Sequence, residues 1–117
     1  MKQEVPEKVW VVGKVRPADT HRTPIEAGEG QGLAPLTVLD KDGERALPAF
    51  TTRLKAEQGI LHFMTSEERA DGPIASVRIL VGELIEVFQG TQPEGVQVVD
   101  YIGIDMGEGG MYPLIRL

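Results

Sequence analysis

The chain has 117 residues, is 41% hydrophobic and carries a formal net charge of −6 at pH 7. This length predicts one domain built around one core. The sequence contains no cysteine, which excludes disulfides, thiolate metal ligands and a cysteine nucleophile. No segment approaches the roughly 20 apolar residues of a membrane span, and the N-terminus has charges and a proline where a secretory signal needs an apolar run. We therefore expect a soluble cytoplasmic protein without a membrane partner.

The acidic charge lies entirely in the second half of the chain. Residues 1–58 contain nine basic and nine acidic side chains, whereas residues 59–117 contain three and nine. Proteins that bind nucleic acid draw much of their affinity from clustered Lys and Arg, so nucleic acid is not expected as a partner. The acidic surface favours solubility, and it would also suit a basic protein partner.

The first element in chain order is an apolar, β-branched strand over residues 9–15. Trp10 lies within this strand, and its apolar neighbours predict that it is buried. Residues 16–34 contain two prolines and three glycines with little apolar periodicity, which predicts a long loop.

A hairpin is the clearest local prediction in the sequence. Two apolar runs within residues 34–50 flank Asp-Lys-Asp-Gly, and Asp42 and Gly43 tolerate the positive φ angles of a tight turn. The two runs should therefore pair as antiparallel strands. Pro48 cannot donate a ladder hydrogen bond, so we expect its strand to be at a sheet edge or bulged there.

Two middle segments each allow two interpretations. Residues 51–73 fit one helix interrupted at Gly59, or a turn followed by a short strand and a short helix. Thr65 and Glu68 match a capping box that starts a helix at Ser66. Residues 73–89 fit one amphipathic helix, or a strand followed by a helix that stops at Gly90.

The end of the chain predicts two more strands, over residues 95–105 and 111–117, on either side of a glycine-rich loop. The whole chain, residues 1–117, is thus expected to form a single small α+β domain. Its mixed or antiparallel central sheet would include the 34–51 hairpin and the 96–105 strand, with one or two helices packed on it.

Residues 36–52 resemble the N-terminal domain of SseB-like bacterial proteins, which have an apolar strand, an Asp-x-Asp-Gly turn and a Leu-Pro-x-Phe-Thr-Ser strand end. The matching residues here are Asp40, Asp42, Gly43, Leu47, Pro48, Phe50, Thr51 and Thr52. The similarity extends over about residues 34–105. It implies a small α+β domain with a strand and then a helix over residues 77–89, and it implies no catalytic residue set and no cofactor.

The sequence departs from that family at the end of the last matching strand. The family commonly has Asn-Pro there, whereas this chain has Asp105 and Met106, followed by residues 107–117 as an additional stretch. Because specialised features would lie in this stretch, Asp105 and Glu108 are the candidate residues of a functional loop.

No metal or cofactor site is expected. His21 and His62 lack a second histidine at helical spacing, which argues against zinc. Asp100, Asp105 and Glu108 do not follow the spacing of a calcium loop, and a hairpin explains the acids of residues 40–44.

Phosphate binding and nucleophilic catalysis are not indicated either. The glycine-rich runs 28–32 and 107–110 lack the P-loop ending, contain a glutamate and precede no convincing helix. Ser66 and Ser76 are the only serines, and neither lies in a nucleophile elbow. The expectation is therefore a chain that is not an enzyme, with catalytic residues unassigned.

The leading hypothesis is a non-enzymatic protein-interaction or regulatory module of SseB-like type, with a protein partner or a homodimer formed at the Pro48 edge. The alternative is a small-molecule-binding protein or an enzyme, whose 16–34 and 103–110 loops close over a pocket.

Overall fold

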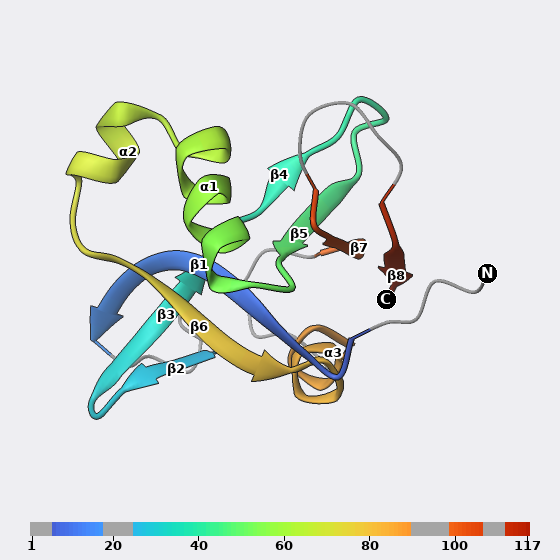
Figure 1. Ribbon diagram of the computed structural model, residues 1–117, viewed down its shortest axis with the longest axis horizontal. Coiled ribbons are helices and arrows are strands. Elements are labelled where there is room, and N and C mark those ends of the chain that lie inside the picture. The colour runs from blue at the N-terminus through green and yellow to red at the C-terminus, as the bar shows by residue number, and fades with distance from the viewer. Residues whose placement is uncertain (1–5, 18–24, 90–98, 107–111) are drawn as a thin grey trace.

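The computed structural model describes residues 6–17, 25–89, 99–106 and 112–117. Its helices are α1 (Arg53–Phe63), α2 (Ser66–Ala70) and α3 (Val81–Gln89). Its strands are β1 (Lys8–Pro17), β2 (Ile25–Gly28), β3 (Gln31–Pro35), β4 (Val38–Leu39), β5 (Arg45–Ala49), β6 (Ile74–Leu80), β7 (Tyr101–Ile104) and β8 (Leu114–Arg116). The predicted α+β class is confirmed (Figure 1).

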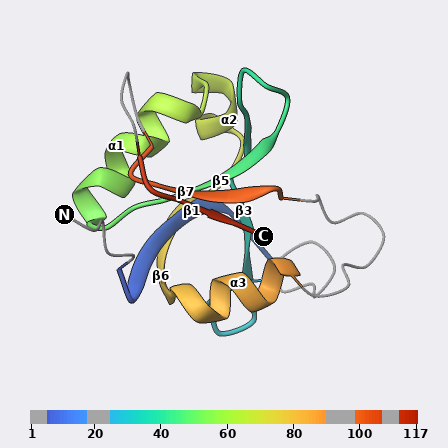
Figure 2. The ribbon, with the colours of Figure 1, turned by 90° about the vertical axis from the view of Figure 1, so that its right-hand side faces the viewer.

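The strands form two four-stranded sheets. Sheet A has the order β2-β3-β1-β6 and is antiparallel throughout, while sheet B has the order β4-β5-β7-β8 and pairs β5 with β7 in parallel. Trp10 in β1 and Phe50 at the end of β5 exchange backbone hydrogen bonds of 2.7 and 2.8 Å, which join the sheets. Figures 1 and 2 show α1 and α2 on one side of the strands and α3 on the other.

The predicted hairpin is confirmed as β4 and β5. The Asp40 N–H donates to the Glu44 carbonyl at 2.9 Å, and the Gly43 N–H donates to the Asp40 carbonyl at 3.1 Å. Gly43 has a φ of +81°, the left-handed conformation for which this position needs glycine. The expected central sheet with this hairpin and the closing strand corresponds to sheet B.

The prediction that the Pro48 strand is at a sheet edge or bulged is wrong, because β5 lies between β4 and β7 and its register with β7 is regular through Pro48. The carbonyls of Arg45 and Ala49 accept hydrogen bonds from the β7 side, so by strand alternation Pro48 faces the opposite side. There β4 has already ended, since it pairs only with Arg45 and Ala46. The missing N–H of Pro48 therefore leaves no ladder partner unsatisfied, although its strand is internal.

The long loop predicted for residues 16–34 is also wrong in its described part. β2 and β3 form a hairpin there, and Gly30 in the turn has a φ of +70°. Only Ile25 and Leu33 are large apolar residues in these strands, and both are buried. Two isolated apolar residues among glycines leave too little periodicity to indicate strands. Residues 18–24 lie outside the described part.

α1 continues through Gly59 without interruption, which neither interpretation of this segment anticipated. A Cβ atom on Gly59 would collide with the Phe50 ring, so the glycine permits close packing and does not end the helix. The predicted capping box is confirmed: the Thr65 hydroxyl accepts from the Glu68 N–H, and the Glu68 carboxylate accepts from the Thr65 N–H.

The second ambiguous segment is a strand, β6, followed directly by the helix α3. The predicted helix stop at Gly90 lies outside the described residues, as do residues 95–98 of the predicted closing strand. The remainder of that strand is β7, and β8 is the predicted final strand within residues 112–117.

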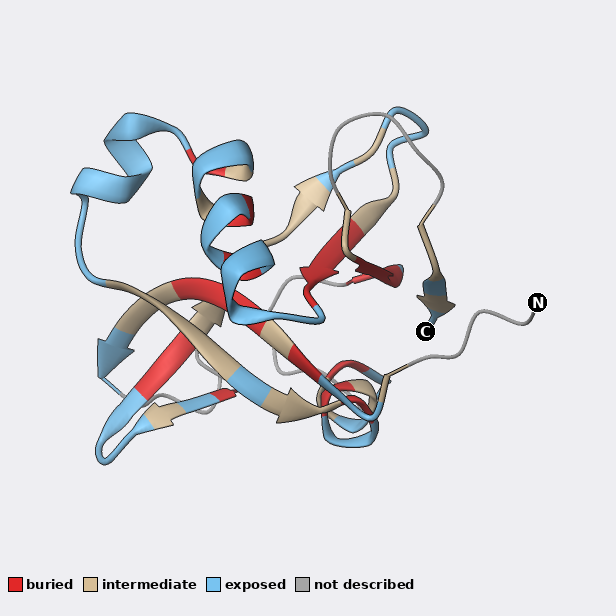
Figure 3. Cartoon of the chain, in the orientation of Figure 1, coloured by how far each residue is buried: buried red, intermediate tan, exposed pale blue. Residues whose placement is uncertain are grey.

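The core has two parts, shown in red in Figure 3. The larger part lies between α3 and the inward faces of both sheets, and its largest fully buried side chains include Leu33, Leu47, Leu84 and Ile102. The smaller part centres on Phe50 under α1, and Trp10 packs against it. Trp10 is only partly buried, so its predicted burial is confirmed in part. Because both sheets contribute to the larger part, the described residues form one unit.

Candidate functional site

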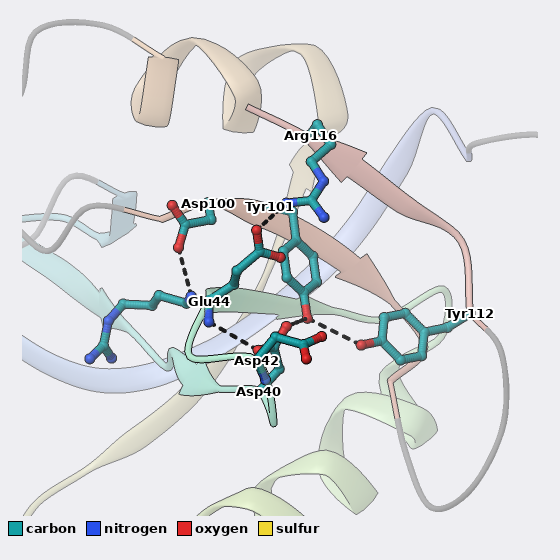
Figure 4. A network of polar contacts seen from close by, with 8 residues as sticks. Asp40, Asp42, Glu44, Asp100, Tyr101, Tyr112 and Arg116 are labelled. Atoms are coloured by element: carbon teal, nitrogen blue, oxygen red, sulfur yellow. Dashed lines mark hydrogen bonds and ion pairs between the residues drawn. The ribbon is translucent and has the colours of Figure 1, made fainter.

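A network of polar side chains surrounds the β4–β5 turn (Figure 4). One oxygen of Asp40 accepts the N–H groups of Asp42 and Glu44 at 2.8 and 2.9 Å. Its other oxygen accepts the Tyr101 hydroxyl of β7 at 2.9 Å, and the hydroxyls of Tyr101 and Tyr112 lie 3.2 Å apart. The turn is thus tied to β7 and to the segment that precedes β8.

Charge reinforces the same connection. Arg116 in β8 donates to the Glu44 carboxylate at 2.7 Å, and its guanidinium lies 5.4 Å from the centre of the Tyr101 ring. Burial of the Tyr101 hydroxyl, together with its contacts to Tyr112 and Asp40, raises its pKa. Tyr101 therefore stays a neutral hydrogen-bond donor at physiological pH.

The Asp40 carboxylate has a structural role. Burial opposes its ionisation, but the hydrogen bonds from Tyr101 and from two backbone N–H groups outweigh that effect and lower its pKa. Both of its oxygens accept hydrogen bonds from protein donors, and these bonds confirm the turn interpretation of residues 40–44. Among the described residues, no group of three or more acidic or histidine side chains is placed to hold a metal ion.

Asp105, one of the two candidates of the predicted functional loop, connects the end of β7 to the start of α1. One carboxylate oxygen accepts the Thr51 N–H at 2.8 Å, and the other accepts the Thr51 hydroxyl at 2.8 Å and the Lys55 ammonium at 3.1 Å. Asp105 has a φ of +54°, and it is the one described non-glycine residue with a positive φ. Such strain is frequent at binding and active sites.

The electrostatic state of Asp105 follows from these contacts. Partial burial of the carboxylate raises its pKa, but the two hydrogen bonds from Thr51 and the Lys55 ammonium have the larger combined effect, so its pKa is lowered. The carboxylate is therefore ionised and fully engaged at neutral pH. This arrangement holds Lys55 over the end of β7.

A cavity of about 460 Å³ opens beside Asp105. Its walls come from the end of β5, from α1 and from the residues that follow β7, namely Phe50, Lys55, Gln58, Gly59, His62, Asp105 and Met106. The absence of a side chain at Gly59 lets α1 pack directly against the Phe50 ring in the wall of the cavity. The volume falls in the range of small-ligand pockets.

Some of the residues singled out in the sequence meet at this cavity and others do not. Asp105 and His62 line it, whereas Asp100 accepts the Arg45 N–H at 2.8 Å, at the opposite end of β7. His21 and Glu108 lie outside the described residues. No described residue of the 16–34 segment lines the cavity, since that segment forms β2 and β3 of sheet A.

Lys55 and Gln58 were not predicted as site residues. Their position would have required knowing that α1 is continuous, since only then do residues 55, 58, 59 and 62 lie on one side of a helix. Because two interpretations of this segment remained open, the sequence alone did not indicate that these four residues are neighbours.

Two exposed leucines of α1 lie on the side of the helix next to the cavity. Leu54 is 64% exposed and Leu61 is 65% exposed, and their spacing of seven residues places them on the same side of the helix. Gln58 lies between them and also lines the cavity. We call Leu54, Gln58, Leu61 and the cavity together the α1 surface.

The fold and site thus define a small α+β domain with two joined sheets and a pocket beside two exposed leucines of a helix. Comparison of the chain with protein-family models, with curated proteins and with solved structures finds no match. In the part of the chain that the structure describes, no helix has the length and apolar character needed to cross a membrane.

Proposed function

We propose that this chain is a non-enzymatic protein-interaction module of the SseB-like kind, and that its partner binds the α1 surface. The observation that carries the proposal is the pair of leucines on one side of α1, both more than three-fifths exposed, next to a cavity of about 460 Å³. Single exposed leucines are ordinary, but two on one side of a helix beside a pocket favour a binding surface.

The two leucines would contribute part of the energy of association. Fully burying one leucine contributes about 1.5–3 kcal/mol, and about two-thirds of each side chain is exposed, so Leu54 and Leu61 together offer about 2–4 kcal/mol before the costs of association. A partner side chain that enters the cavity would add contact with Phe50 and Met106. A few central anchors of this kind carry most of the binding energy in typical interfaces.

The Asp105–Lys55 pair in the cavity wall favours binding over acid–base chemistry. A general base near neutral pH needs a pKa close to 7 and a free lone pair. The Asp105 carboxylate has a lowered pKa and accepts three hydrogen bonds, while the Lys55 ammonium is paired with it. This pair is suited to fixing the shape and polarity of the pocket for a partner.

The test uses exposed leucines as matched controls. One protein carries Leu54→Asp and Leu61→Asp, and the other carries Leu39→Asp and Leu114→Asp, at positions 62% and 46% exposed on β4 and β8. Partners captured by each protein are quantified by mass spectrometry after circular dichroism has verified folding. A partner lost with the α1 variant and kept with the control supports the proposal. A partner retained by both, or lost from both, contradicts it.

The cavity also supports a second candidate, binding of a small molecule. A thermal-shift screen of metabolites would identify such a ligand, and Gln58→Trp, which places a bulky side chain at the cavity wall, should abolish its stabilising effect. Gln89→Trp, the same change at an exposed position of α3, should leave that effect intact. A ligand indifferent to Gln58→Trp would argue against binding at the cavity.

A further inference from the structure

The two sheets have four edge strands, and they differ in how well they are protected against pairing with another chain. β4 has two residues and β8 has three, and the ladder of β2 is irregular between Glu26 and Gly28. Short strands and bulges are the usual means of preventing association at an edge. β6 is the exception, with seven residues in regular register with β1.

The hydrogen bonds of β1 determine which backbone groups of β6 point outward from the sheet. Trp10 in β1 exchanges both of its backbone hydrogen bonds with Phe50, and the Val12 carbonyl accepts from the Leu36 N–H. These two residues therefore point their backbone groups away from β6. Their partners across the ladder, Arg78 and Ser76, must then point their own N–H and C=O groups outward from the sheet.

Those outward groups have no hydrogen-bond partner among the residues that the structure describes. By the same alternation, the backbone groups of Ile74 also point outward, because its partner Lys14 belongs to the set that faces β3. The outer side of β6 thus offers a row of donors and acceptors in the geometry of an unfinished sheet.

The sequence of β6 does little to prevent pairing. It contains neither proline nor glycine, and Arg78 is its only charged residue. Five of its seven residues are Ile, Val, Leu or Ala, and all of its residues except Arg78 are half-buried. Natural edge strands that stay unpaired usually carry more charge or a proline.

From this edge we propose that β6 pairs with β6 of a second copy, in antiparallel orientation, to join the two copies of sheet A into one eight-stranded sheet. A twofold axis perpendicular to the sheet makes the two strands antiparallel and closes the assembly as a dimer. The inference does not depend on the proposed binding at the α1 surface, because it uses no residue of that surface.

The charge on β6 selects the register. Residues whose backbone groups point outward must lie opposite one another across the new ladder. Placing Arg78 opposite Arg78 of the second copy would bring two like charges together. Placing Ser76 opposite Arg78 of the second copy avoids this and uses the whole strand. Ile74 then lies opposite Leu80, so an apolar pair occurs at each end of the shared ladder.

This self-complementarity favours a second copy over an unrelated strand. Each residue whose backbone groups point outward finds an acceptable partner in the same sequence read in the opposite direction, with Val77 at the twofold axis. Cross-strand pairs of suitable chemistry each strengthen such a ladder, and in a symmetric dimer every pair occurs twice.

The first experiment measures the oligomeric state of the full chain by sedimentation and light scattering over a range of concentrations. We expect a dimer that dissociates on dilution for the unmodified protein, and a folded monomer for Ser76→Pro. Proline at this position removes an N–H that points away from β1, so the ladder of sheet A is preserved. Circular dichroism and the cooperativity of thermal unfolding verify that the variant is folded.

Charge variants then test the register itself. Ser76→Lys places a second positive charge opposite Arg78 of the other copy, twice per dimer, and should raise the dimer dissociation constant by about 2- to 30-fold. Ser76→Glu should lower it by a similar factor, and added salt should reduce both effects. Ser66→Lys, at the exposed start of α2, is the matched control and should leave the constant unchanged.

Because the chain has no cysteine, a single introduced thiol reports proximity directly. In the proposed register, the Cα atoms of the two copies of residue 76 are about 8 Å apart. Ser76→Cys should therefore crosslink with a short bifunctional maleimide, and Ser66→Cys should not. A protein that is monomeric at all concentrations overturns the proposal. So does a dimer insensitive to Ser76→Pro, or an edge that pairs only with a different protein.

Discussion

Asp105 offers the sharpest test of the structure, since its backbone and its side chain make separable contributions to stability. Three variants separate them. Asp105→Asn keeps an amide oxygen for the Thr51 N–H and a residue type that tolerates a positive φ. Asp105→Gly removes the side chain but relieves the backbone, while Asp105→Ala removes the side chain and leaves a Cβ atom at a φ of +54°.

The expected magnitudes follow from the contacts. Each of the two hydrogen bonds from Thr51 contributes about 0.5–1.5 kcal/mol, and the ion pair with the half-exposed Lys55 contributes less than about 1 kcal/mol. Water replaces part of these contacts, so Asp105→Gly should lower the free energy of unfolding by about 1–2 kcal/mol. Asp105→Ala should lower it by about 1 kcal/mol more because of the left-handed backbone. Asp105→Asn should cost about 1 kcal/mol or less.

Urea unfolding followed by fluorescence of Trp10, the single tryptophan, measures all three free energies. The order of stability should be wild type, Asn, Gly and Ala. If the alanine variant is at least as stable as the glycine variant, the positive φ at this position is not strained. If all three variants unfold within about 0.3 kcal/mol of the wild type, the carboxylate does not connect β7 to α1 as described.

Three further predictions follow from the packing and the ionisation states. Gly59→Ala should destabilise the fold by about 1–2 kcal/mol, because overpacking against the Phe50 ring outweighs the gain in helix propensity. Gly82→Ala is the control: its Cβ atom meets nothing, so it should be neutral or stabilising by up to about 1 kcal/mol. Equal effects of the two substitutions in urea unfolding would contradict the close approach of Gly59 to Phe50. Tyr101→Phe should cost about 0.5–1.5 kcal/mol in the same assay by removing the hydroxyl from the hairpin network, and an unchanged midpoint would show that this hydroxyl is not held there. Because the pKa of Asp105 is lowered in the folded state, its carboxylate stabilises the fold at pH values above about 4, the unfolded pKa, and this contribution is lost as pH falls through the folded pKa. The free energy of unfolding of the wild type should therefore decline more steeply below about pH 4 than that of Asp105→Asn. Parallel acid profiles would refute the lowered pKa of Asp105.

Local signals in the sequence were sufficient for the elements whose cause is local. The Asp-Lys-Asp-Gly turn and the Thr65 capping box depend on residues within four positions of each other, and both were predicted correctly. The β2–β3 hairpin was missed because its stability comes from pairing with β1 and from burying Ile25 and Leu33 in a core assembled by distant segments. Whether such segments form strands depends on their packing against distant parts of the chain.

Pro48 illustrates the same limit for a single residue. Its missing N–H is a local property, and it indicated an edge strand. The structure places β5 inside sheet B. The pairing of β4 with β5 extends only to Ala46, two residues before Pro48, so Pro48 needs no hydrogen-bond partner on that side. The length of a neighbouring strand is a property of the whole sheet, and the pattern around Pro48 alone does not contain it.

The candidate site was predicted in part. Asp105 was identified because the sequence departs there from the SseB-like pattern, and it lines the cavity. Lys55, its ion-pair partner, lies 50 residues earlier in the chain, and Gln58 and His62 join it only through the continuity of α1. Nothing in either segment alone indicated that they meet.

The parallel pairing of β5 with β7 has a consequence for how the chain reaches this fold. Ala46 pairs with Tyr101 and Lys8 pairs with Leu80, so both sheets close only when segments more than 50 residues apart find each other. Such long loops must be closed at an entropic cost before the contacts that compensate for it can form. We therefore expect folding on the scale of milliseconds to seconds, with the β4–β5 hairpin and α1 as early local structure and the two sheets completed together in the final cooperative step.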